Sequence, residues 1–253
     1  MNDLLTFTSI AEFKSHRAKL TSRVGLVPTM GALHAGHASL IQQCAEKNDV
    51  TIVTIYVNPT QFNNADDLNK YPKTFEADLE LAQKAGAQII LAPTYEEIYP
   101  DGYTYKVTES EFSKTLCGSH RPGHFDGVLT IVLKLLQITD ADTAYFGEKD
   151  FQQFKLIEKM SSAFFLKTKI KSCSTLREAD GLAMSSRNVR LTAPGREKAP
   201  LIYKALTTAP TAAKARQILE NENIQVEYLE DHDRRRFVAA FIDQVRLIDN
   251  VKI

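Results

Sequence analysis

The sequence contains no tryptophan, only three cysteines among 253 residues, and no excess of either charge, since Lys+Arg and Asp+Glu both number 31. Cys44, Cys117 and Cys173 are far apart and form no C-x-x-C pair, so the pattern favours neither a disulfide framework nor a thiolate zinc site. We therefore expect a reducing, cytoplasmic environment. The zero net charge provides no overall cationic field for a phosphate backbone, and we expect no nucleic-acid partner.

Segments for export or membrane insertion are also lacking. Residues 1–5 show no basic stretch followed by an apolar one, and no run is long enough to span a bilayer. We expect the chain to stay where it is made and to have no membrane partner. The densest charge cluster, residues 231–236, mixes both signs, and we interpret it as a solvated face without a function.

The remaining composition, 43% apolar and 25% charged, is typical of soluble globular proteins. In the first part of the chain, short β-branched runs alternate with segments of helical periodicity. The expected order is helix 9–20, strand 24–27, helix 37–47, strand 50–57, helix 75–85 with Gly86 as its cap, strand 88–92, helix 128–138, strand 143–147, helix 150–163 and strand 169–173. This alternation predicts an α/β fold, a Rossmann-like doubly wound parallel sheet over residues 1–174.

Beyond residue 174 the rhythm of strands weakens. That part is rich in alanine and charge, with helical stretches near residues 196–206 and 234–245 and a short strand at residues 225–229. We predict a smaller C-terminal α+β domain over residues 175–253.

The most informative motif follows the first buried strand, because ligands of an open parallel sheet bind where its strands end. Residues 28–37 read PTMGALHAGH, a glycine-punctuated loop that runs into a helix. The N–H groups of a helix start favour phosphate, and Gly31 and Gly36 allow a ligand close to the backbone. His34 and His37 are three residues apart, hence on one face, where both can point at the same phosphate oxygens.

Two other interpretations of these histidines exist. A single histidine at a helix start is usually a cap or a surface residue, but two that flank a glycine favour a ligand. Zinc is the second alternative, although no third ligand with suitable spacing is apparent and the H-E-x-x-H form is absent. The H-x-G-H pattern resembles the signature of the nucleotidyltransferase superfamily, whose members act on the α-phosphate of ATP.

Polar side chains also follow later strands. Asn58 and Gln61 come after the second strand, and Lys149 and Gln153 come after a later one. The two glutamines could bind the oxygens of a hydroxy acid, although a lone glutamine is most often a surface residue. Lys149 supplies a cation for phosphate, unless its acidic neighbours merely pair with it.

A last polar loop, residues 176–188, reads LREADGLAMSSRN. Ser185, Ser186 and Arg187 place two hydroxyls and a planar cation close together, which suits β- and γ-phosphates. The alternative is an ordinary loop that caps a helix.

Taken together, these pieces resemble the family of pantoate–β-alanine ligases, or pantothenate synthetases, in order and spacing from about Gly25 through Leu191. The residues that carry the resemblance are PTMGALHAGH, YVNPTQF, YPKT, RPGHFDGV, FGEKDFQQ and READGLAMSSRN, with a weaker match at residues 246–250, RLIDN. The combination is far more specific than H-x-G-H alone.

The resemblance implies a Rossmann-like enzyme that condenses pantoate with β-alanine through a pantoyl adenylate, with ATP and Mg²⁺, as a homodimer. Residues expected around ATP are Met30, Gly31, Ala32, Leu33, His34, Ala35, Gly36, His37, Gly147, Glu148, Lys149, Asp150, Leu176, Met184, Ser185, Ser186 and Arg187. Residues expected around pantoate and β-alanine are Asn58, Gln61, Arg121 and Gln153. His34, His37, Lys149 and Arg187 are the expected catalytic residues, and His37 matches the position treated as a proton donor.

Two departures from the family pattern are visible. Cys117 stands where many relatives carry a glutamate, which puts any role of that carboxylate in doubt. The C-terminal part, which covers the site in the family, looks shorter than usual, although its Ser-Ser-Arg loop is intact.

The expected chemistry follows from charge. The carboxylate of pantoate is already ionised at neutral pH, since carboxyl pKa values lie near ~4, so adenylation needs no general base. It needs cations and donors that hold two anions together. The alternative is a nucleotidyltransferase that stops after joining a nucleotide to a phosphorylated acceptor. The glutamine-rich acceptor side speaks against it, since a phosphorylated acceptor would favour extra Arg or Lys there. A non-catalytic nucleotide-binding regulator would lack one of the His, Lys or Ser-Arg elements, and none is missing.

Overall fold

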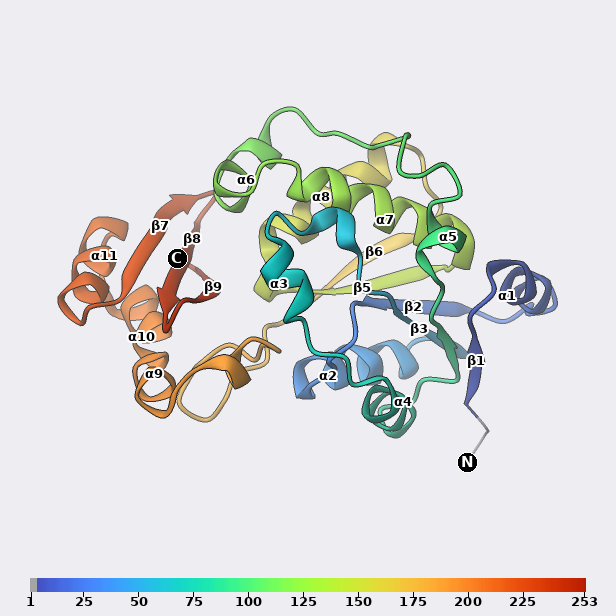
Figure 1. Ribbon diagram of the computed structural model, residues 1–253, viewed down its shortest axis with the longest axis horizontal. Helices are drawn as coiled ribbons and strands as arrows, with labels where there is room; N and C mark the ends of the chain where they lie inside the picture. The colour runs from blue at the N-terminus through green and yellow to red at the C-terminus, as the bar shows by residue number, and fades with distance from the viewer. Residues whose placement is uncertain (1–3) are drawn as a thin grey trace. The chain divides into compact units, whose positions relative to one another are not determined.

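A computed structural model of the protein describes residues 4–253, which form two compact units (Figure 1). The N-terminal unit comprises the described residues up to Gly147 together with Gln152–Cys173. The C-terminal unit comprises Glu148–Phe151 and Ser174–Ile253. The prediction about a leader segment falls partly on residues 1–3, which lie outside the described residues.

A six-stranded parallel sheet forms the centre of the N-terminal unit. Its strands are β1 (Leu5–Phe7), β2 (Val24–Thr29), β3 (Val50–Ile55), β4 (Ile89–Leu91), β5 (Thr143–Gly147) and β6 (Lys169–Cys173), in the order β1-β4-β3-β2-β5-β6. Every neighbouring pair is parallel. The order reverses at β2, whose neighbours are β3 and β5, and this confirms the doubly wound α/β prediction.

Helices cover both faces of this sheet. Figure 1 shows α2 (Ala35–Ala45) and α4 (Phe75–Lys84) on one face and α7 (His124–Thr139) and α8 (Phe151–Ala163) on the other. Shorter helical segments of this unit are α1 (Ile10–Arg17), η1 (Pro59–Gln61), α3 (Ala65–Asn69), α5 (Tyr95–Ile98), η2 (Phe112–Lys114) and α6 (Cys117–His120). Each helix predicted from periodicity in this part is present, with ends that differ by a few residues.

The strands are buried because they are sandwiched between these helices. Val24, Leu26 and Val27 of β2 are all fully buried, as expected for a continuous apolar run in a parallel sheet. At the edge, β6 instead exposes Lys169 and Lys171, and charged side chains on an edge strand discourage pairing with another chain.

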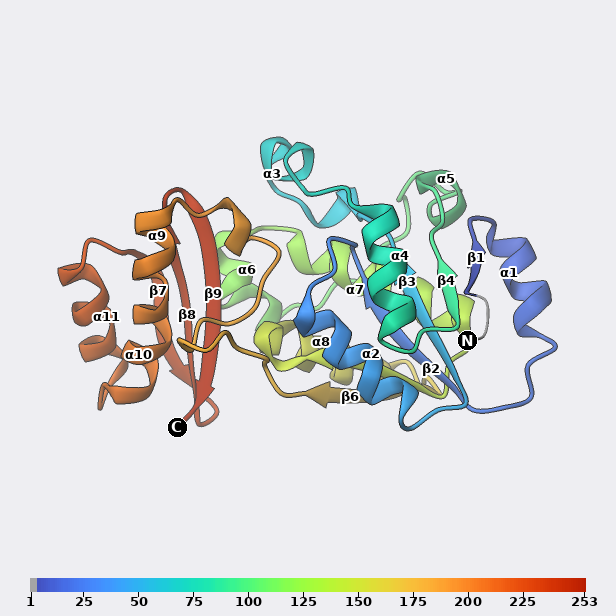
Figure 2. The same cartoon turned by 90° about the horizontal axis from the view of Figure 1, so that it is seen from below.

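The C-terminal unit is built on a three-stranded antiparallel sheet. Its strands are β7 (Gln225–His232), β8 (Arg235–Ile242) and β9 (Val245–Lys252), in that order. Its helical segments are η3 (Glu148–Asp150), η4 (Asn188–Arg190), α9 (Ala193–Lys198), α10 (Pro200–Thr208) and α11 (Ala212–Asn221). Figure 2 shows α10 and α11 on one face of the sheet, where an apolar core includes Ile202, Leu219 and Val238.

The helix predicted at residues 234–245 is wrong. This stretch forms β8 and the turn that leads into β9. Asp243 and Gln244 both have positive φ, 52° and 65°, which is the backbone of a two-residue type I′ hairpin. Because β8 is the central strand and is buried along most of its length, its apolar residues do not alternate with polar ones. Such a run, with alanines in it, resembles a helical segment in sequence.

The interpretation of residues 231–236 as a solvated face is also wrong for part of the cluster. Arg236 is 2% exposed, forms an ion pair with Asp231 at 2.8 Å, and donates to the carbonyl oxygen of Ala209 at 2.6 Å. This arginine therefore lies at the C-terminal end of α10, where it satisfies backbone acceptors. The helix predicted near residues 196–206 is divided between α9 and α10, and α11 was not predicted.

Candidate active site

The glycine-punctuated loop after β2 is fixed by a buried carboxylate. Asp78 of α4 is 2% exposed and accepts hydrogen bonds from the backbone N–H groups of Ala32 at 3.0 Å and Leu33 at 2.8 Å, and from the Thr74 hydroxyl at 3.0 Å. Gly31 has φ of +79°, and a Cβ there would lie 2.9 Å from Asp78. The loop therefore needs glycine at this position and a carboxylate beneath it.

His34 and His37 form the start of α2. His34 is its N-cap, and its Nδ1 accepts from the N–H of Gly36 at 3.1 Å. The His34 N–H donates to Nδ1 of His37 at 3.3 Å, and the two ring centroids are 4.1 Å apart. His34 is therefore a helix cap, as the alternative interpretation had it, and the two rings lie close together, as their three-residue spacing predicts.

This cap determines which ring nitrogens carry protons. A nitrogen that accepts a hydrogen bond bears no hydrogen, so in this arrangement both rings hold their proton on Nε2. Nδ1 of each ring is thus engaged within the motif, and the helix start adds the N–H groups of its first turn.

The residues predicted after β2 and β3 lie together. Nε2 of Gln61 is 3.1 Å from Sδ of Met30, and Oε1 of Gln61 accepts from Nδ2 of Asn58 at 3.0 Å. Asn58 is 1% exposed, and its Oδ1 also accepts a hydrogen bond from the Tyr99 hydroxyl at 2.9 Å. Burial raises the pKa of Tyr99 to about 12, so this hydroxyl stays a donor at neutral pH.

Two residues of the RPGHFDGV segment hold the backbone at Gln61. His124, 8% exposed, contacts the carbonyl oxygen of Gln61 through Nδ1 at 2.7 Å. Arg121 donates to the same oxygen at 3.2 Å and lies 3.0 Å from Nε2 of His124. Arg121 is thus brought to the predicted substrate group, while His124 and Asp78 are site residues that we did not predict. His124 could have been found from its place inside the RPGHFDGV segment. No sequence pattern pointed to Asp78.

Gln153 lies half-buried in the first turn of α8. Its neighbour Gln152 is 5% exposed and holds the segment at residues 112–117: it accepts from the N–H of Cys117 at 3.1 Å and donates to the carbonyl oxygens of Phe112 and Thr115. Cys117 itself is buried. The place of Gln153 in an acid pocket stays a prediction.

In the C-terminal unit, η3 carries Glu148, Lys149 and Asp150. The Lys149 side chain is 19% exposed and its Nζ lies 3.6 Å from the Asp150 carboxylate. Glu148 pairs instead with Arg235 of β8 at 3.1 Å. Of its two acidic neighbours, Lys149 therefore pairs with Asp150, at the long distance of 3.6 Å, and Glu148 pairs with Arg235.

The second polar loop of this unit is a small hairpin. Its arms are joined by an antiparallel bridge between Arg177 and Ala183 and by a hydrogen bond of 3.0 Å from the N–H of Met184 to the carbonyl oxygen of Leu176. Beyond it, the Ser185 hydroxyl accepts from the N–H of Arg187 at 3.2 Å. Leu176, Met184, Ser185, Ser186 and Arg187 therefore belong to one folded segment, as predicted from their closeness in sequence.

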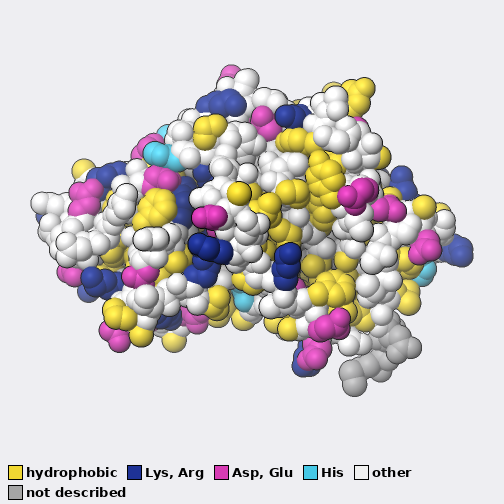
Figure 3. Space-filling view, in the orientation of Figure 1, with side chains coloured by type: hydrophobic (Ala, Val, Ile, Leu, Met, Phe, Trp, Pro, Cys, Tyr) yellow, Lys and Arg dark blue, Asp and Glu magenta, His cyan; other side chains and the backbone are white. Residues whose placement is uncertain are grey.

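On the face drawn in Figure 3, basic and acidic side chains of the described residues are interspersed. Residues 4–253 contain no helix that is long and apolar enough to cross a membrane.

Comparisons with known proteins agree along the whole chain. A family model described as pantoate-beta-alanine ligase matches residues 5–252. The pantothenate synthetase of Bdellovibrio bacteriovorus is 52% identical over 245 residues, which covers 97% of this chain and 98% of that protein. The pantothenate synthetase of Legionella pneumophila strain Lens is 50% identical, with 90% of each chain covered. The first of these relatives is therefore matched over nearly its whole length, and the expectation of a C-terminal part shorter than usual in the family stays a prediction.

Solved structures give the same result. A crystal structure of the pantoate-beta-alanine ligase of Francisella tularensis, complexed with "Beta-gamma ATP" and β-alanine, has a TM-score of 0.94 at 40% identity and covers 99% of this chain and 98% of that chain. The pantothenate synthetase of Thermus thermophilus has a TM-score of 0.90 at 34% identity, with 98% and 99% covered.

Proposed function

The chain belongs to the pantoate–β-alanine ligase family, and from this premise we infer that it condenses pantoate with β-alanine at the expense of ATP to give pantothenate, a step toward coenzyme A. The observation that carries the inference is the family match over residues 5–252. The reaction proposed has two steps. The pantoate carboxylate attacks the α-phosphorus of ATP and releases pyrophosphate, and the amine of β-alanine then attacks the carbonyl carbon of pantoyl adenylate and releases AMP.

We propose that the phosphates of ATP are bound at the start of α2 and by the two polar segments of the C-terminal unit. The paired Nε2–H donors of His34 and His37 and the helix start suit phosphate oxygens. Lys149 and Arg187 add the positive charge that stabilises the leaving pyrophosphate. The other residues assigned to ATP are Met30, Gly31, Ala32, Leu33, Ala35, Gly36, Gly147, Glu148, Asp150, Leu176, Met184, Ser185 and Ser186.

Pantoate is assigned to the amide side chains of Asn58 and Gln61 in the N-terminal unit. Gln61 is aligned by Asn58 through its side chain and by Arg121 through its backbone, so its amide is preorganised to bind hydroxyl and carboxylate oxygens. Gln153 is assigned to the same acid. In the second step the β-alanine amine must be neutral to attack, and the oxygen that bridged carbon and phosphorus leaves with AMP.

The proposal also includes finer assignments. Mg²⁺ would arrive with ATP, held through the substrate phosphates, and would neutralise part of their charge. We assign residues 1–174 to ATP and pantoate binding and residues 175–253 to a cover domain. A cytoplasmic homodimer completes the proposal.

A direct test supplies the purified protein with ATP, Mg²⁺, pantoate and β-alanine and measures all products. We expect one AMP and one pyrophosphate for each amide formed. Formation of ADP and phosphate, or of no amide, would contradict the proposed function.

A further inference from the structure

The weakest part of the sequence resemblance, RLIDN at the end of the chain, contains two consecutive buried polar residues whose role the reaction above does not require. Asp249 is 5% exposed and Asn250 is 3% exposed. Both lie on β9, where successive side chains point to opposite faces of the sheet. Each therefore contacts a different partner.

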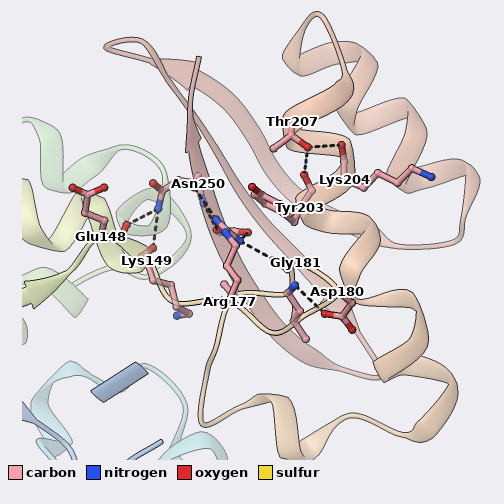
Figure 4. A network of polar contacts seen from close by, with 12 residues as sticks. Glu148, Lys149, Arg177, Asp180, Gly181, Tyr203, Lys204, Thr207 and Asn250 are labelled. Atoms are coloured by element: carbon pink, nitrogen blue, oxygen red, sulfur yellow. Dashed lines mark hydrogen bonds and ion pairs between the residues drawn. The ribbon is translucent and has the colours of Figure 1, made fainter. Parts of the chain in front are cut away.

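Asn250 holds the segment that carries Lys149. Its Nδ2 donates to the carbonyl oxygens of Glu148 and Lys149, at 2.9 Å in both cases (Figure 4). Its Oδ1 accepts from Arg235. Arg235 also pairs with Glu148 and stacks on the ring of Phe151 at 3.7 Å. The amide thus uses both of its donors on the backbone of η3, and Arg235 fixes which way the amide faces.

Asp249 holds the hairpin that leads to Ser185 and Arg187. Its two carboxylate oxygens accept a bidentate pair from Arg177 at 2.6 and 2.9 Å. The Arg177 guanidinium also donates to the carbonyl oxygen of Gly181 at 3.1 Å and stacks on the ring of Tyr203 at 3.8 Å (Figure 4). This planar, bidentate geometry fixes the base of the hairpin in orientation as well as in position.

We propose that Asp249 and Asn250 are positioning residues for ATP: adjacent on one strand, they fix the η3 segment with Lys149 and the 176–187 hairpin with Arg187 relative to each other. The inference rests on the proposed function of those two segments. Neither residue touches substrate in this proposal. Each acts through backbone or through Arg177, so that two cationic groups are held at a set spacing before the triphosphate arrives.

The test uses Asn250→Asp in the full-length protein. The substitution keeps the shape of the side chain but replaces two donors by an acceptor facing two carbonyl oxygens. Exchange of labelled pyrophosphate into ATP, with pantoate and Mg²⁺ but no amine, gives KM values for both substrates. We expect the KM for ATP to rise roughly 10- to 100-fold, with the KM for pantoate unchanged within about twofold. Asp249→Asn cannot accept hydrogen bonds from both terminal nitrogens of Arg177. It should likewise raise the KM for ATP and leave the KM for pantoate unchanged.

Glu227→Gln is the matched control. It removes another ion pair of the same sheet, between Glu227 of β7 and Arg246 of β9 at 3.0 Å. Hydrogen exchange supplies a second readout: amides of residues 148–151 should exchange faster in Asn250→Asp and not in the control. Should Asn250→Asp not fold, Asn250→Ser replaces it, since a hydroxyl can satisfy one carbonyl.

Three results would overturn the inference: an unchanged KM for ATP, equal changes in both KM values, or the same change in the control. Each would make the RLIDN residues merely structural. These outcomes are distinct from failure of the proposed function, in which the wild-type protein itself would show no pyrophosphate exchange.

Discussion

At the scale of single residues, the two histidines of the H-x-G-H motif combine structural and chemical roles. The same side chains cap α2 through Nδ1 and present N–H groups at Nε2. Loss of activity in an alanine variant would therefore be ambiguous, because alanine also removes the cap.

His34→Asn separates these roles. Asparagine is among the best N-cap residues, whereas alanine at such a position costs about 1 kcal/mol. We expect His34→Asn to unfold in urea like the wild type but to lose roughly 10²–10³ in the rate of pyrophosphate exchange, as when one preorganised donor is removed. Wild-type exchange in this variant would reduce His34 to a cap.

The neighbouring glutamines of α8 offer a second contrast. Gln152 is buried with three hydrogen bonds to the 112–117 segment, whereas Gln153 is half-buried and assigned to pantoate. Gln152→Ala should destabilise the fold by about 1–3 kcal/mol, because buried backbone groups lose their partners. Gln153→Ala should leave stability nearly unchanged and raise the KM for pantoate without raising that for ATP. Equal changes in the two KM values would remove Gln153 from the acid pocket.

At the scale of elements, the sequence was most informative where each local preference agreed with burial. The strands at residues 143–147 and 169–173 agree with the prediction to the residue. The β8–β9 hairpin was missed, since its turn, Asp243-Gln244, lacks the glycine that usually marks a type I′ turn.

That turn can be improved. Gln244 has φ of +65°, a conformation that costs a residue with a side chain roughly 1 kcal/mol. Gln244→Gly should therefore raise the free energy of unfolding by about 1 kcal/mol, measured by urea denaturation. The matched control is Gln225→Gly, an exposed position within strand β7, where glycine should lower it by roughly 0.5–1 kcal/mol. A loss of stability in both variants would contradict the turn assignment.

At the scale of the whole molecule, the α/β fold could be predicted from the alternation of strands and helices. Most candidate site residues could be proposed because they lie in segments that directly follow strands. What could not be predicted are the supports. Asp78 is 46 residues from the loop that it fixes, and Asn250 is 101 residues from Lys149. Such pairings depend on which elements the fold brings together, and no local pattern marks them.

The folded core also sets a pH limit. Burial raises the pKa of the Cys44 thiol to about 11 from its usual 9.0. Because the raised pKa belongs to the folded state, its contribution to stability is complete below pH 9 and is lost as the pH rises toward 11. We expect the free energy of unfolding to fall across this window. In Cys44→Ala the fall should be smaller, by up to about 3 kcal/mol. Parallel curves for the two proteins would contradict the assignment to Cys44.

The central claim is that the chain makes an acyl adenylate, and the order of bond making tests it most directly. The purified protein is given ATP, Mg²⁺ and pantoate labelled with ¹⁸O in its carboxylate, with labelled pyrophosphate and no amine, and β-alanine is added afterwards. We predict exchange of pyrophosphate into ATP before the amine is present, and then one ¹⁸O in AMP, because the bridging oxygen leaves with phosphorus. An ¹⁸O label that remains wholly in the amide, with AMP unlabelled, would contradict the account.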